Sequence, residues 1–217
     1  MGFNRNVFVN CPFDREYLPL LRPLLFTIVY LGLKPRIALE ALDSGAPRIQ
    51  KIIELITQSR YAIHDLSRLQ AHQAGEYYRL NMPFELEVDV GCRLFGTGRF
   101  PKKRCLVLET ERYRYRAAIS DLSGSDIGVH HGDPQSIVTE VRNWLNNQAG
   151  LRSPGPASVW GAFVDFMADN YDDLKGRGFS DRDIEELPVN ELMDCIEKWV
   201  TRRRFAMRAG RPRKRSR

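Results

Sequence analysis

Three carboxylates lie close together in the stretch RLNMPFELEVDVG, which runs from Arg79 to Gly91. They are Glu85, Glu87 and Asp89, and a fourth acid, Asp65, ends a short apolar run upstream. An ionised carboxylate beneath a ribose ring can stabilise the positive charge that develops when an N-glycosidic bond breaks, or it can capture the sugar covalently. Chemistry on a nucleoside or nucleotide is therefore one interpretation of these acids, and solvation of the wet face of a helix is the other.

Short β-rich runs alternate with helical runs through the first two thirds of the chain, and this pattern predicts the elements that must position the acids. Alternating strands and helices predict an α/β fold with a parallel sheet and helices on both faces, here in the flavodoxin-like, doubly wound order 2-1-3-4-5. The switch point of that order lies between strands 1 and 3, where ligands bind. Strands are expected at 6–12, 34–42, 60–67, 103–109 and 127–130, and helices at 14–33, 46–59, 82–96 and 134–148.

Local residue types refine the first of these helices. Asp14 is expected to be its N-cap, whereas Pro19 and Pro23 predict that it starts late or is kinked.

Apolar spacing predicts the buried faces of the next two helices. Ile49, Ile52, Ile53 and Ile56 form such a face in the second helix, and Phe84, Val88, Cys92 and Phe95 form one in the third.

The acids of the third helix are not equivalent in this prediction. Glu85 is expected in the first turn, whose dipole favours a negative charge. Glu87 and Asp89 are expected on the solvated face, with Asp89 paired to Arg93 four residues on.

Three chain segments should meet at the switch point: the exit of strand 1, the exit of strand 3, and the start of the helix that carries Glu85. Asp65 is expected to bind ribose hydroxyls, Arg15 to hold a phosphate, and Tyr78 with Arg79 to stack on a base and hold a phosphate. The nucleotide-binding candidates are Asn10, Phe13, Asp14, Arg15, Ser67, Tyr78, Arg79 and Asn81.

The motifs VFVNCPFD, AIHDLS and NMPFELEVDVG, in this order, resemble the superfamily of nucleoside 2-deoxyribosyltransferases and TIR-like nucleotide-binding domains. The resemblance covers roughly residues 5–145. It implies that Glu85 is the nucleophile or the stabiliser of the sugar cation, that Asp65 binds the sugar, and that Asn10 and Phe13 line the pocket.

The resemblance implies a nucleotide- or NAD-directed N-glycosidase, acting as a base-releasing hydrolase or a base-exchange transferase. It also implies a bacterial defence effector that acts as a homo-oligomer, with NAD or a nucleotide as substrate or ligand and no separate cofactor. A nucleotide sensor that turns nothing over, and a DNA-associated protein anchored by its basic tail, are the alternatives.

The distribution of charge separates the end of the chain from its body. The segment 202–217 holds nine of the 33 Lys and Arg and no acid, so residues 1–201 carry 24 cationic against 27 acidic residues, a net charge of −3. We expect an α/β domain at 1–149, a linker at 150–158, a helical module at 159–201 and a disordered basic tail at 202–217. The residues of the tail that resemble a minor-groove hook, and are expected to bind DNA weakly, are Arg211, Arg213, Lys214 and Arg215.

Other classes of function find no support in the sequence. No apolar run is long enough to span a membrane, and we expect a cytoplasmic protein with reduced thiols. The four cysteines are scattered, with no spacing typical of a metal site, and neither a Walker motif nor GxGxxG occurs.

Overall fold

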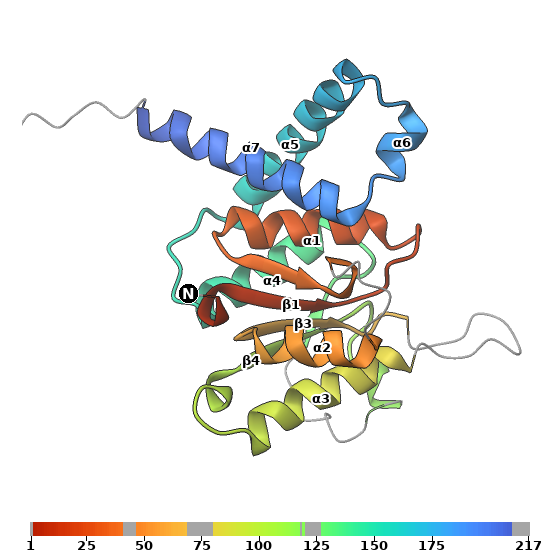
Figure 1. The fold of residues 1–217 in the computed structure, drawn as a ribbon, viewed down its shortest axis with the longest axis vertical. Helices are drawn as coiled ribbons and strands as arrows, with labels where there is room; N and C mark the ends of the chain where they lie inside the picture. The colour runs from red at the N-terminus through yellow and green to blue at the C-terminus, as the bar shows by residue number, and fades with distance from the viewer. Residues whose placement is uncertain (1, 41–46, 69–79, 118, 120–126, 210–217) are drawn as a thin grey trace, which may run out of the picture. The chain divides into compact units, whose positions relative to one another are not determined.

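The computed structural model describes residues 2–40, 47–68, 80–117, 119 and 127–209. The chain divides into two compact units, Met1–Trp160 and Gly161–Arg217. The elements of each unit are drawn in Figure 1.

A five-stranded parallel sheet forms the centre of the first unit, and its order β2-β1-β3-β4-β5 confirms the predicted flavodoxin-like α/β fold. Strand β1 is buried along its whole length, as a strand covered on both faces must be. In the register of the sheet, Asn10 lies opposite His64 and Asp65 lies opposite Leu108. The strands are β1 (Asn6–Asn10), β2 (Lys34–Ile37), β3 (Tyr61–Asp65), β4 (Arg104–Glu109) and β5 (Gly128–Val129).

Four helices cover the two faces of this sheet. Helices α1 (Leu18–Tyr30) and α4 (Pro134–Gln148) lie together on one face, and α2 (Arg48–Thr57) and α3 (Asn81–Phe95) lie on the other (Figure 1). Single 3-10 turns join the larger elements at Phe3–Arg5, Ala38–Glu40, Phe100–Lys102 and Arg114–Ala117.

Helix α1 starts late, as its prolines predict, but Asp14 is not its N-cap. The helix begins at Leu18 and accommodates Pro19 at its second position, where no intrahelical N–H is needed. Asp14 instead closes the preceding turn, because its Oδ1 accepts a hydrogen bond of 3.0 Å from the backbone N–H of Tyr17.

The apolar spacing in α2 predicts only part of the face that is buried. Ile52 and Ile56 are buried together with Leu55, whereas Ile49 and Ile53 are exposed. Strand β2 is also shorter than expected, since the chain turns into the 3-10 helix Ala38–Glu40.

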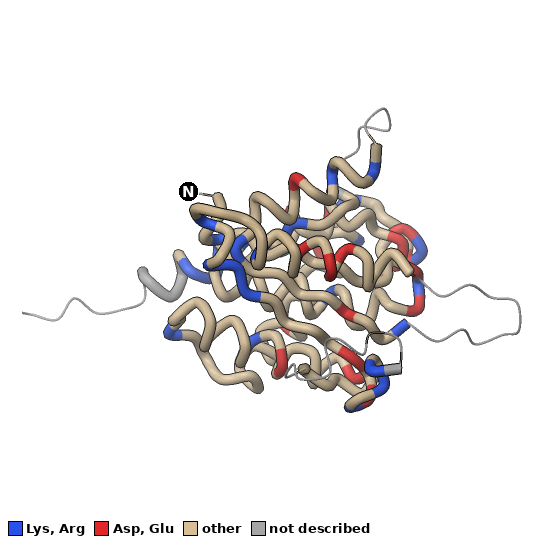
Figure 2. The backbone as a smooth tube through the Cα atoms, turned by 90° about the horizontal axis from the view of Figure 1, so that it is seen from below, with Lys and Arg blue, Asp and Glu red and all other residues tan. Residues whose placement is uncertain are grey.

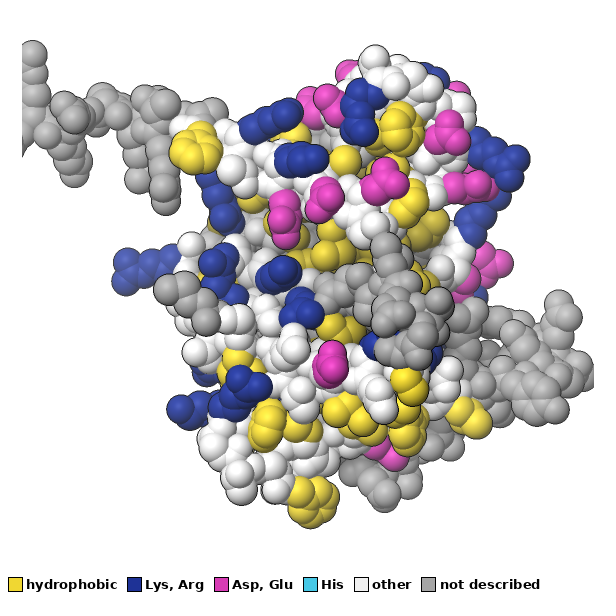
Figure 3. All heavy atoms as spheres, viewed as in Figure 1, with side chains coloured by type: hydrophobic (Ala, Val, Ile, Leu, Met, Phe, Trp, Pro, Cys, Tyr) yellow, Lys and Arg dark blue, Asp and Glu magenta, His cyan; other side chains and the backbone are white. Residues whose placement is uncertain are grey.

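The predicted face of α3 is correct only in part, and the predicted solvation of Asp89 is wrong. Val88 and Cys92 are partly buried and pack against a core cluster that includes Phe8. Phe84 and Phe95 are 52% and 86% exposed, and Figure 3 shows hydrophobic side chains over the lower part of the molecule, where α2 and α3 lie. Asp89 is only 2% exposed, because it has ionic partners on β3 and before β4, described below. The buried residues of α3 are Met82, Glu85, Leu86 and Asp89.

Charged residues lie at both ends of the sheet. Basic residues gather near the N-terminus in Figure 2, where Arg5 precedes β1, Arg60 precedes β3 and Arg104 begins β4. Acids lie at the opposite, carboxyl end, where Asp65 ends β3 and Glu109 ends β4. The carboxyl end, at which a ligand is expected, thus has an acid at the end of two neighbouring strands, with arginines such as Arg68 and Arg114 nearby.

The second unit is helical. Helix α5 (Pro156–Gly176) begins within the expected linker, because proline is well suited to the first position of a helix. Helix α6 (Asp181–Glu185) has the capping box of Ser180 with Asp183. Helix α7 (Val189–Ala209) extends into the segment expected to be a disordered tail, since no glycine or proline interrupts it before Gly210. In the described part of the chain, no helix is both long and apolar enough to cross a membrane.

Candidate functional site

The three segments expected at the switch point do meet, around the side chain of Cys11. This thiol is fully buried just beyond β1. Burial raises the pKa of Cys11, and the nearby negative charges of Asp65, Glu85 and Asp14 raise it further. Carboxylates from β3, from α3 and from the β1 exit therefore act electrostatically on one thiol at the carboxyl end of the sheet.

Glu85 is the least satisfied of these acids. It lies in the second turn of α3, not in the first turn as expected, and it is 3% exposed. Its Oε1 has no hydrogen-bond donor among the described residues, and Nη2 of Arg48 lies 3.8 Å away, beyond hydrogen-bonding distance. Burial raises the pKa of Glu85, and the positive charge of Arg48 opposes that rise.

Asp65, by contrast, is fully engaged by the protein. It is completely buried, and its Oδ1 accepts a hydrogen bond of 2.8 Å from the backbone N–H of Ser67. The hydroxyl of Tyr17 donates to Oδ2, and Nε2 of His130 lies 3.1 Å from the same oxygen. Both oxygens of Asp65 thus already accept a hydrogen bond from the protein, and its expected role as a sugar binder stays a prediction.

These contacts determine the ionisation of Asp65. Burial alone raises the pKa of Asp65, but the hydrogen bond and charge of His130, with the hydrogen bonds from Ser67 and Tyr17, lower it below its ordinary value. The sequence does not indicate that Tyr17 and His130 are partners of Asp65. Their neighbouring residues do not show that the start of α1, the end of β3 and the end of β5 lie close together in the fold.

Asn10 is buried at the end of β1 and joins two elements. Its Nδ2 donates a hydrogen bond of 2.9 Å to the backbone oxygen of Met82 in the first turn of α3, and lies 3.1 Å from Nδ1 of His64 on β3. Its Oδ1 is buried and has no donor among the described residues. The amide is thus anchored through its nitrogen, while its oxygen is unpaired.

A buried ionic chain lies behind Asn10. Nε2 of His64 is 3.2 Å from Oδ2 of Asp89, and Nζ of Lys103 is 2.9 Å from Oδ1 of the same carboxylate. Burial raises the pKa of Asp89, but the contacts with His64 and Lys103 outweigh burial and lower it. Nothing in the sequence pattern of α3 marks Asp89 as a buried acid, because both partners lie far away in the chain.

Arginines near the carboxyl end balance the remaining acids. Arg68 lies 3.3 Å from Asp14 and 3.0 Å from Glu16. Arg114 lies 2.5 Å from the buried Glu109 and donates to the backbone oxygen of Ser67. A ligand phosphate must compete with these carboxylates for the guanidinium groups.

The other expected site residues differ in their exposure. Phe13, Asp14 and Ser67 are half-buried near the site, whereas Arg15 and Asn81 are exposed. The remaining expected residues, Tyr78, Arg79, Arg211, Arg213, Lys214 and Arg215, lie outside the described residues.

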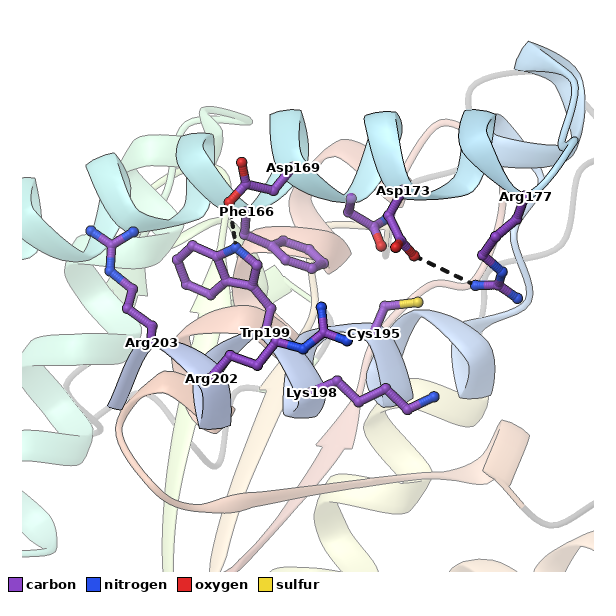
Figure 4. Close-up of a pocket in the computed structure, with 10 residues that line it drawn as sticks. Phe166, Asp169, Asp173, Arg177, Cys195, Lys198, Trp199, Arg202 and Arg203 are labelled. Carbon is purple, nitrogen blue, oxygen red and sulfur yellow. Dashed lines mark hydrogen bonds and ion pairs between the residues drawn. The ribbon is translucent and has the colours of Figure 1, made fainter. Parts of the chain in front are cut away.

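A separate hollow of about 700 Å³ lies between α5 and α7 of the second unit. Figure 4 shows two contacts of its acids: Asp169 accepts a hydrogen bond of 2.7 Å from Nε1 of Trp199, and Asp173 lies 3.8 Å from Arg177. None of the buried polar atoms without a hydrogen-bond partner among the described residues belongs to this hollow.

Within the described ranges, no group of three or more His, Cys, Asp or Glu side chains is arranged to hold a metal ion. Comparison of the chain with protein-family models, with curated proteins and with solved structures gives no match.

Proposed function

We propose that this chain binds a nucleotide or NAD at the carboxyl ends of β1 and β3 and breaks its N-glycosidic bond, with Glu85 as the catalytic carboxylate. The single observation that carries this proposal is the buried Oε1 of Glu85, which accepts no hydrogen bond from the described residues. A buried carboxylate oxygen without a donor costs free energy, roughly 1–3 kcal/mol, and such a cost is typical of functional sites. Its negative charge is therefore available to a developing sugar cation.

The proposed reaction needs only the carboxylate and water. The bond between C1′ and the base nitrogen breaks, and the electron pair leaves with the base. Glu85 stabilises the positive C1′ or bonds to it, and water then attacks C1′ to form the new hydroxyl. The proton released by water goes to the base, or to solvent when the departing base was cationic, as in NAD.

Arg48 has a defined part in this proposal. It lies at the start of α2 with an exposed side chain, and it is the ion-pair partner of Glu85. Its charge favours the ionised form of Glu85 against the effect of burial. We assign Arg48 to keeping the carboxylate ionised and near the sugar, with NAD or the nucleotide as substrate and no additional cofactor.

The setting of the proposed function follows the resemblance described above: a defence effector in the cytoplasm that acts as a homo-oligomer. All four cysteines are free thiols, which agrees with a reducing compartment.

Incubation with NAD and a panel of nucleotides, followed by chromatography for released base, tests the proposal. We expect at least one of these compounds to release its base, either directly or after phage or cyclic nucleotides have been added as triggers. Binding without release under every condition would instead identify a nucleotide sensor, and neither binding nor release would exclude both functions.

A further inference from the structure

The amide of Asn10 has only one orientation that its neighbours permit. The backbone oxygen of Met82 is an obligate acceptor, so the atom 2.9 Å from it must be Nδ2. A flipped amide would place Oδ1 against this carbonyl, with two lone-pair atoms facing each other. Oδ1 therefore points away from α3 and from the contact with Met82.

The same logic assigns the protons of His64. Nδ2 of Asn10 is a donor, so Nδ1 of His64, 3.1 Å away, accepts and carries no proton. The imidazole proton is then on Nε2, which faces Oδ2 of Asp89 at 3.2 Å. Nζ of Lys103 forms an ion pair with the other oxygen of Asp89 at 2.9 Å, so Asp89 meets a positive charge on one side and the Nε2 proton of His64 on the other.

All four members of this chain are buried, so water does not compensate for a reversed bond. A change of tautomer at His64 would set a proton against the Nδ2 protons of Asn10 and leave Asp89 without its donor. The chain Lys103–Asp89–His64 thus holds the amide of Asn10 in place.

One acceptor remains unused after this assignment. Oδ1 of Asn10 is buried, has no donor among the described residues, and cannot exchange places with Nδ2. It lies at the end of β1, next to Cys11, around which Glu85 and Asp65 gather. Each oxygen of Asp65 already accepts a hydrogen bond from the protein, whereas Oδ1 of Asn10 accepts none from the described residues, so Oδ1 is the acceptor that most needs a ligand donor.

We infer that Oδ1 of Asn10 accepts a hydrogen bond from a ribose hydroxyl of the bound ligand, that His64 and Asp89 are the positioning residues that fix this orientation, and that the site consequently selects ribonucleotides over their deoxy counterparts. The ligand class rests on the proposed function. A buried acceptor built to meet a hydroxyl discriminates against a ligand without one, because the acceptor is then left unpaired.

Calorimetric titration with NAD, the four ribonucleoside monophosphates and their 2′-deoxy and 3′-deoxy counterparts tests the inference. We expect a ribonucleotide to bind roughly tenfold more tightly than one of its two deoxy counterparts, a ratio that corresponds to one hydrogen bond. Asn10→Ala should bring this ratio close to one. An undiminished ratio in Asn10→Ala, or no preference in the wild type, would overturn the inference while leaving the proposed function intact. If neither NAD nor any nucleotide binds, the proposed function falls and this inference falls with it.

Two variants of His64 separate positioning from a merely structural role. Asparagine places an acceptor near the position of Nδ1, whereas glutamine places its amide near Nε2. His64→Asn should therefore keep more of the ribonucleotide preference than His64→Gln, although both replace the same buried ring. Equal preference in the two variants would contradict the positioning role, with circular dichroism as the control for folding.

A measurement without ligand tests the buried chain of Lys103, Asp89, His64 and Asn10 directly. Nitrogen-15 NMR of the histidine rings should show His64 protonated at Nε2 and bare at Nδ1 at neutral pH. A proton at Nδ1 would overturn the assignment of Asn10 regardless of any nucleotide result.

Discussion

Lys103 and Asp89 form a buried ion pair, with Nζ 2.9 Å from Oδ1 and side chains only 2% and 3% exposed. Nζ also donates to the backbone oxygens of Ile56, at 2.7 Å, and Ser59, at 2.5 Å. The ammonium group thus donates two hydrogen bonds to backbone oxygens and forms an ion pair with Asp89. The pair ties α3 to the end of α2 and to the start of β4.

Lys103→Met should destabilise the first unit strongly, because Asp89 would be left as a buried charge without its cation. We expect a loss of about 3–5 kcal/mol in the free energy of unfolding, measured by urea denaturation. Lys102→Met is the matched control, because its side chain is exposed, and we expect it to change stability by less than about 0.5 kcal/mol. A loss at Lys103 no larger than at Lys102 would show that the pair does not exist in solution.

Tyr17→Phe should destabilise the protein in a pH-dependent way. The folded-state pKa of Asp65 is lowered, so its contribution is present above the unfolded pKa of about 3.9 and is lost as pH falls through the folded value. Removing the hydroxyl donor costs about 1.5–3 kcal/mol at neutral pH, the range for a hydrogen bond to a charged group.

The loss in Tyr17→Phe should shrink as Asp65 becomes protonated in acid, which unfolding curves between neutral and acid pH would reveal. Tyr113→Phe, at an exposed position, should have no such effect. A loss that is constant across this pH range would contradict the ionised state of Asp65.

Glu85→Gln should stabilise the protein at neutral pH, in contrast to most substitutions of buried residues. The folded-state pKa of Glu85 is raised, so stability falls as pH rises from the unfolded pKa of about 4.3 through the folded value. The variant escapes this cost, and we expect a gain on the order of 1 kcal/mol at neutral pH. The gain should vanish below the unfolded pKa. A neutral-pH loss would mean that the ion pair with Arg48 outweighs the cost of burying Glu85.

Deletion of residues 210–217 tests the basic end of the chain without shortening α7, which runs to Ala209. The deleted segment holds Arg211, Arg213, Lys214, Arg215 and Arg217. If the tail binds DNA phosphates, the truncated protein should be retained less strongly on DNA. The slope of log affinity against log salt concentration should become smaller by roughly 0.9 for each phosphate that the tail neutralises. Unchanged retention and slope would exclude this segment as a DNA anchor.

The order of the sheet could be predicted from the sequence because each buried strand and each helix has its own local pattern of residue types. The run NVFVN and the 134–148 helix show this, since each folds close to where its residue types place it. For the candidate site, the sequence predicted only that the exits of strands 1 and 3 and the start of α3 meet at the switch point.

The partners within the site were not predictable, because they depend on contacts between distant segments. The burial of Asp89 depends on His64 and Lys103, and no apolar periodicity signals it. In the same way, the hydrogen bond from Tyr17 to Asp65 joins residues 48 positions apart, so an acid expected to face the ligand is satisfied internally. The error at Phe84 and Phe95 is the opposite one, since both were expected to be buried and both are exposed.

The rate of base release by Glu85→Gln, compared with Glu87→Gln, is the most direct test of the central claim. Both substitutions remove one negative charge from α3, but Glu85 is buried beside Cys11 and Glu87 is exposed. We predict that Glu85→Gln lowers the rate at least about 100-fold, as expected for loss of a charge-stabilising group, and that Glu87→Gln leaves the rate unchanged. Release by Glu85→Gln at the wild-type rate would contradict the assignment of Glu85 as the catalytic carboxylate.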